Sequence, residues 1–220
     1  MAAGEPARGR GLAIKPVTRR AALQLGLFGL VAGRSARVEA QAQKPAWALG
    51  LVDAARKQIG VTTLYDPTYL RIAYPGGDVR ADRGVCTDVV IRAYRTAFAL
   101  DLQKRVHEDM VAGFSAYPRD WGMKAPDPNI DHRRVPNLAA YFRRKGAALP
   151  VSEAAGDYKA GDLVTQMLPG NLSHIVIVSS GFSQTAPGRP TVIQNIGQGA
   201  REDDTLFDFP HTGHYRCAPV

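Results

Sequence analysis

The spacing of apolar residues changes along the chain, and this change restricts the possible fold more than any other sequence feature. Up to residue 145 apolar side chains recur at helical intervals, whereas from residue 162 short β-prone runs are separated by Gly, Pro, Asn and Ser. Helices followed by strands are typical of an α+β domain with a segregated antiparallel sheet. The predicted helices span 47–60, 85–99, 101–112 and 135–145, and the predicted strands span 162–168, 174–180, 191–196 and a short segment near 214–217.

The formal net charge of +8 on 220 residues is concentrated at the N-terminus. Residues 1–42 contain seven Lys and Arg against two Glu, a net charge of +5, which leaves +3 for the rest. Without that segment the chain has no basic patch interleaved with aromatic residues, so we expect no nucleic-acid partner. Two cysteines are too few for a disulfide scaffold or a four-cysteine zinc site. We expect one domain over 43–220.

The N-terminal segment has the layout of an export signal. A basic stretch ends in Thr18-Arg19-Arg20, a twelve-residue apolar run spans 21–32, and Ala40 and Ala42 offer an A-x-A cleavage site. The paired arginines resemble a twin-arginine signal, with a Sec signal or an uncleaved anchor as alternatives. We therefore expect passage through an export translocon into a Gram-negative periplasm, without a stable membrane anchor after cleavage.

Cys86 stands directly before an apolar-periodic helix. A thiol at a helix N-terminus is close to the positive end of the helix dipole and to unpaired N–H groups, which lower its pKa and favour the nucleophilic thiolate. The same N–H groups can bind an oxyanion. Cys86 is therefore a candidate nucleophile, and a buried structural cysteine or a disulfide with Cys217 are the alternatives.

Polar side chains follow at the ends of two later strands. His174 opens an apolar strand, where an imidazole can accept the proton of a thiol and later protonate a leaving amine. Gln194 and Asn195 end the next predicted strand and can orient an imidazole. Adjacent strand residues point to opposite faces, so only one of these amides can face His174.

A Cys, a His and an amide in this order resemble the NlpC-type papain-like cell-wall cysteine peptidases. The similar stretches are Tyr74-Pro75-Gly76-Gly77 with Cys86 nine residues on, Gly161-Asp162-Leu163-Val164, His174-Ile175-Val176-Ile177-Val178 and Gln194. The resemblance implies a papain-like fold in which a helical N-terminal half packs on a small antiparallel sheet. It also implies that Cys86 attacks a carbonyl, with the Cys86 N–H and Tyr74 stabilising the oxyanion.

A closer resemblance is to the domain of unknown function 1287 family of exported bacterial proteins, and it extends over nearly all of residues 50–216. The stretches that carry it are 76–79, 84–92, 107–110, 129–138, 161–162, 195–197 and 212–216.

The chain departs from the two family patterns at two places. Thr87-Asp88 replaces the Ser-Gly that follows the peptidase cysteine. The Asp88 carboxylate is well placed to cap the helix, and it would raise the thiol pKa if it approached the sulfur. Cys217 stands where the 1287 family resemblance implies an aromatic residue, so we expect it to be dispensable for function.

The segment Asp131-His132-Arg133-Arg134 precedes the last predicted helix and is the candidate substrate-binding segment. Arg133 or Arg134 can bind a carboxylate in a bidentate manner, such as those of the meso-diaminopimelate and D-Glu groups of peptidoglycan. The alternative is helix capping by Asp131 beside solvated arginines.

The function predicted from the sequence is an exported cysteine hydrolase of peptide or amide bonds, acting on peptidoglycan or its peptide fragments, with no metal or cofactor. Two alternatives remain open. One is a catalytically silent periplasmic protein that binds a peptidoglycan fragment. The other is a zinc hydrolase whose ligands would come from His132, His174, His211 and His214.

Overall fold

The computed structural model describes residues 45–219, so the predicted export signal over 1–42 lies outside the described residues. Four α-helices precede most of the sheet, as the apolar spacing predicts: α2 (Ala46–Arg56), α3 (Cys86–Phe98), α4 (Leu102–Ala112) and α5 (Val135–Arg144). No described helix is long and apolar enough to cross a membrane.

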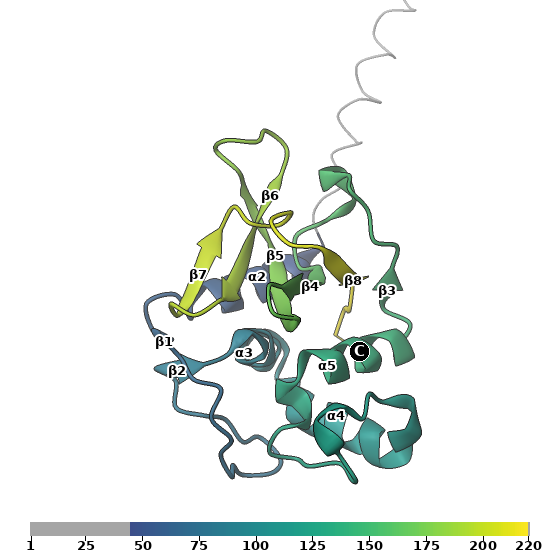
Figure 1. Cartoon of the computed structure of the whole chain (residues 1–220). Coiled ribbons are helices and arrows are strands. Elements are labelled where there is room, and N and C mark those ends of the chain that lie inside the picture. The colour runs from purple at the N-terminus through teal and green to yellow at the C-terminus, as the bar shows by residue number, and fades with distance from the viewer. Residues whose placement is uncertain (1–44, 220) are drawn as a thin grey trace, which may run out of the picture. The chain divides into compact units, whose positions relative to one another are not determined.

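Six strands form one antiparallel sheet in the order β3-β8-β4-β5-β6-β7 (Figure 1). They are β3 (Ala148–Leu149), β4 (Leu163–Leu168), β5 (Leu172–Phe182), β6 (Pro190–Asn195), β7 (Ala200–Asp203) and β8 (His211–Tyr215). The α+β class is therefore confirmed. Strands β3 and β7 and the short parallel pair β1 (Leu64–Tyr65) and β2 (Arg83–Gly84) were not predicted from the sequence. Strands of two to four residues show too little alternation to be recognised.

The sheet buries both of its faces. Along β5, Ile175 and Ile177 belong to the large core that α2, α3 and α5 fill, whereas Val176 and Val178 pack in a second cluster with Leu206. This alternation follows from the two-residue repeat of a strand. Figure 1 shows α3 and α5 next to the sheet and α4 on their far side.

Polar contacts of Arg92, in the middle of α3, hold the preceding segment against the helix. The buried Arg92 side chain pairs with Asp78 through Nε–Oδ2 at 2.9 Å and donates to the carbonyls of Val79, Arg80 and Arg83. These contacts hold the irregular segment 78–83 against α3. The chain therefore enters the helix at Cys86 along a fixed path.

A second polar contact ties α2 to β7. Arg56 Nε lies 2.8 Å from Glu202 Oε2, and Arg56 Nη2 lies 3.1 Å from Glu202 Oε1. Glu202 also accepts hydrogen bonds from Ser179 and Thr191. The Arg56 hydrogen bond is the main cause that lowers the pKa of Glu202 to about 2.

We expect Glu202→Gln to destabilise the protein in a pH-dependent way. Because the folded-state pKa lies below the usual 4.5, the ionised carboxylate stabilises the fold above pH 4.5, and this stabilisation is lost as the pH falls towards 2. Urea unfolding should show a deficit of ~1–2 kcal/mol at pH 7 that disappears near pH 2. The exposed Glu153→Gln is the matched control, and a pH-independent deficit in Glu202→Gln would contradict the assignment.

Candidate functional site

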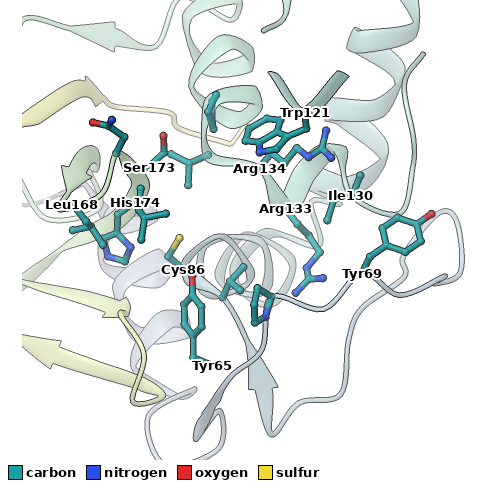
Figure 2. A pocket seen from close by; sticks show the side chains of 16 residues that line it. Tyr65, Tyr69, Cys86, Trp121, Ile130, Arg133, Arg134, Leu168, Ser173 and His174 are labelled. Atoms are coloured by element: carbon teal, nitrogen blue, oxygen red, sulfur yellow. The ribbon is translucent and has the colours of Figure 1, made fainter. Parts of the chain in front are cut away.

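A cleft of about 480 Å³ contains the predicted nucleophile and the predicted base. Cys86 is the first residue of α3, and His174 lies near the start of β5 (Figure 2). The thiol also contacts the backbone N–H of Ile175, the residue after His174. The fold therefore brings together two side chains that lie 88 positions apart in the sequence.

The environment of Cys86 differs from the predicted one. The side chain is only 4% exposed, and burial raises the pKa of its thiol to about 11. The N–H groups of Ile175, Thr87 and Cys86 lower this pKa, as expected at a helix N-terminus, but they do not offset the loss of hydration. The expectation of a lowered thiol pKa was therefore wrong. Cys86 and Cys217 are both free, so no disulfide joins them.

Asp88 caps α3, and Arg133 compensates most of its negative charge. Its Oδ2 accepts a hydrogen bond from the Val85 N–H at 2.7 Å, and both of its oxygens lie 3.0 Å from the Arg133 guanidinium. Gly84 is needed at this point, because a Cβ there would lie 2.8 Å from Asp88 Oδ2. The residual charge of Asp88 contributes to the raised thiol pKa of Cys86, after burial.

His174 is held by Gln194. The His174 Nε2 atom lies 2.7 Å from Gln194 Oε1, and only 2% of the His174 residue is exposed. Burial lowers the pKa of His174, and the hydrogen bond to Gln194 partly opposes this shift. Since the thiol pKa is raised and the imidazole pKa is lowered, both groups are neutral at pH 7. No hydrogen bond joins the two side chains within the described structure.

The two neighbouring amides on β6 make different contacts. Gln194 shares its sheet face with Val192, whereas Asn195 shares the opposite face with Ile193. From there Asn195 Nδ2 donates to the carbonyl of Gly84 at 3.0 Å, two residues before Cys86. The structure thus places Gln194 on the imidazole and Asn195 on the backbone that leads to the thiol.

Tyr65, and not the predicted Tyr74, lies beside the thiol. Figure 2 shows the hydroxyl end of Tyr65 next to Cys86. Burial is the main cause that raises the pKa of Tyr65 to about 12. The negative charges of ionised Cys86 and of Asp88 are smaller contributions in the same direction. Tyr74 lies outside the cleft, 40% exposed, with its ring edge-on to His107 at 5.1 Å. Nothing in the irregular segment 61–84 distinguishes one tyrosine from another, so sequence reasoning missed Tyr65.

The family described as "Domain of unknown function (DUF1287)" matches residues 52–217. The chain belongs to this family. It is also similar to the uncharacterized protein YijF of Escherichia coli (strain K12), with 54% identity over 168 residues, which make up 76% of this chain and 80% of the relative. No solved structure matches significantly, so the function of this DUF1287 cleft has to be inferred from its geometry.

The four residues of the predicted substrate-binding segment separate into two pairs. Asp131 and His132 are buried away from the cleft of this DUF1287 protein. Asp131 Oδ2 lies 2.9 Å from His107 Nδ1 and accepts the Asp127 N–H, and burial raises its pKa. Burial lowers the pKa of His132 to about 4. Asp131 does not cap α5, because the residue at the N-cap is Arg134.

Arg133 and Arg134 both line the cleft, but only one is available to a ligand. The Arg133 guanidinium already donates hydrogen bonds to Asp88 and to the carbonyls of Asp66 and Thr68. Arg134 instead lies over the ring of Trp121 at 4.4 Å, and its Nη1 is buried with no hydrogen-bond partner among the described residues.

The histidines considered as zinc ligands are engaged elsewhere. His211 contacts the Tyr158 hydroxyl and the Leu206 carbonyl, and His214 Nε2 lies 2.8 Å from Asp162 Oδ2. Within residues 45–219, no three His, Cys, Asp or Glu side chains come together in a group that could hold a metal ion.

The raised thiol pKa can be measured directly. In a Cys217→Ser background, the rate of Cys86 alkylation by iodoacetamide should still be rising at pH 10, because the ionised fraction follows a pKa of about 11. In the same protein unfolded in urea, the alkylation rate should reach half its maximum near the usual thiol pKa of about 8.5–9 and level off above it. A plateau below about pH 8.5 in the folded protein would contradict the burial argument.

Proposed function

We propose that this protein is an exported cysteine hydrolase of peptide or amide bonds, with peptidoglycan stem peptides as its substrates. The observation that carries the proposal is that Cys86 and His174 line one cleft and that His174 is hydrogen-bonded to Gln194. A thiol, an imidazole and an orienting amide form the arrangement that nucleophilic cysteine catalysis requires.

The chemistry proceeds from two neutral groups. Cys86 Sγ bonds to the substrate carbonyl carbon while its proton passes to His174. The C–N bond then breaks as His174 returns this proton to the leaving amine. Water adds to the resulting thioester, giving up a proton through His174, and the carboxylic acid leaves as the thiol re-forms. Coupling proton transfer to attack suits a thiol whose pKa is about 11, since no thiolate has to form beforehand.

The oxyanion would be stabilised at the start of α3. The first N–H groups of a helix have no intrahelical acceptor, so the Cys86 N–H is available to the developing charge. The Tyr65 hydroxyl is the second donor in the proposal, in place of Tyr74. A cysteine at a helix N-terminus against an antiparallel sheet that carries the base and the amide supports the proposed papain-like, NlpC-type fold.

The substrate class follows from the charge of the cleft. No Asp or Glu occurs among the described residues that line it, whereas Arg134 does, and its buried Nη1 has no hydrogen-bond partner among the described residues. A planar guanidinium stacked on an aromatic ring still presents its edge to a carboxylate. Stem peptides carry such carboxylates, and the twin-arginine-like segment Thr18-Arg19-Arg20 supports a periplasmic location where they are found.

A specific observation favours a second candidate function. The high thiol pKa of Cys86 is what a catalytically silent protein would show if it kept the cleft only to bind a peptidoglycan fragment. The two candidates differ in turnover, because the binder leaves the peptide intact.

Digestion of purified sacculi, with products identified by mass spectrometry, tests both candidates. The native protein should release peptide fragments, and Cys86→Ala should release none while its melting temperature changes little, since only one sulfur atom is lost. His174→Ala should lower the rate by ~10²–10⁴-fold, the usual contribution of a general base. Hydrolysis by Cys86→Ala would remove the thiol from the mechanism. Binding without hydrolysis by the native protein would establish the second candidate.

The neighbouring arginines provide a matched pair of variants. Arg133→Met should lower the free energy of unfolding by about 3–5 kcal/mol, because it leaves the Asp88 carboxylate buried and unpaired. Arg134→Met should leave stability nearly unchanged and weaken binding of a stem tripeptide to the Cys86→Ala protein. Calorimetry with the tripeptide and its amidated form measures the effect. Equal affinity of Arg134→Met and its parent for the free acid would exclude Arg134 as the carboxylate contact.

A further inference from the structure

The amide of Gln194 is held from behind by two polar groups that the proposed mechanism does not use. Gln194 Nε2 donates to Asp203 Oδ2 at 3.0 Å and to Thr205 Oγ1 at 2.8 Å. Asp203 is the last residue of β7, and Thr205 follows two residues later. The Asp203 Oδ2 atom also accepts a hydrogen bond from Arg201 Nε at 2.5 Å, so a positive charge lies next to this carboxylate.

Strand register explains why these side chains meet. Gln194 pairs with Arg201 across β6 and β7, and Val192 pairs with Asp203. Asp203 is therefore the diagonal neighbour of Gln194 on the same sheet face, within reach of its side chain. Gln194 is in turn close to His174 on β5, so one row of polar side chains crosses three adjacent strands.

The chemistry of this row fixes the orientation of each member. An ionised carboxylate only accepts hydrogen bonds, so the Asp203 side must receive the NH₂ group of Gln194. The carbonyl oxygen Oε1 then faces His174, and because it too only accepts, His174 Nε2 must carry the hydrogen. A neutral imidazole carries one N–H, which leaves Nδ1 as the basic nitrogen.

We propose that Asp203 is a positioning residue that sets the tautomer of His174 through the amide of Gln194. The proposal deepens the hydrolase function and rests on it for its consequence: only an unprotonated Nδ1 can accept the Cys86 proton. Thr205 does not replace Asp203 in this role, because a hydroxyl both donates and accepts and so tolerates either amide orientation. In Ser-His-Asp hydrolases the wrong histidine tautomer lowers kcat by about 10⁴-fold.

The test combines nitrogen NMR of the free protein with kinetics. With ¹⁵N-labelled histidine, His174 in the native protein should show Nε2–H and an unprotonated Nδ1 at pH 7.5. Asp203→Ala should introduce the Nδ1–H form and lower kcat by about tenfold or more with KM nearly unchanged. Asp203→Glu should restore the native tautomer. Asp204→Ala is the matched control, because the adjacent carboxylate pairs with Arg189 and does not contact Gln194.

The outcomes separate this proposal from the hydrolase function. An Asp203→Ala protein that keeps the Nε2–H tautomer and its full kcat would overturn the positioning role. A tautomer change in a protein that hydrolyses nothing would support the positioning role and refute the hydrolase. If Asp203→Ala does not fold, Asp203→Asn can replace it. The Asn side chain has the shape of Asp, but it can present either an acceptor oxygen or a donor NH₂ group to Gln194. It should give a mixture of the two tautomers, and the native tautomer alone would again overturn the proposal.

Discussion

The buried ion pair between Asp88 and Arg133 is the interaction on which the rest of the cleft depends. Each side chain is 3% exposed, and Asp88 also caps the helix that begins at Cys86. Arg133 extends this contact to the carbonyls of Asp66 and Thr68, which follow Tyr65 along the chain. This ion pair therefore joins the start of α3, the segment 65–68 and the turn before α5. Breaking it would leave a buried charge unpaired, which costs much free energy.

The same burial that strengthens this ion pair also sets the character of the thiol. Cys86 is almost completely buried, and the helix N-terminus alone does not recover the lost hydration energy of a thiolate. A cysteine in this position therefore rests as a neutral thiol. The cleft thus holds a neutral thiol and a neutral imidazole, in contrast to cysteine sites where an adjacent charge lowers the thiol pKa.

The sequence predicted the helices and the main strands well, because these elements are long enough to show their repeat. It also predicted that Cys86 and His174 would lie in one cleft and that one amide of β6 would contact His174. Which amide faces His174 could not be predicted, since the choice depends on the face of β6 that packs against the helices. The role of Arg133 depends on its long-range contact with Asp88, and that of Tyr65 depends on the path of an irregular segment. Neither leaves a local pattern.

The adjacent amides on β6 have a consequence for how the DUF1287 chain can vary. Gln194 faces the imidazole and Asn195 faces the backbone before the thiol, so both halves of the cleft take their alignment from two consecutive residues. A shift of β6 by one residue would exchange the two faces and disconnect both contacts at once. The turn 183–189 between β5 and β6 can therefore change in length only in ways that preserve this pairing. The alignment of the cleft therefore depends on the residue-by-residue pairing of a hairpin whose turn contributes no residue to the cleft lining.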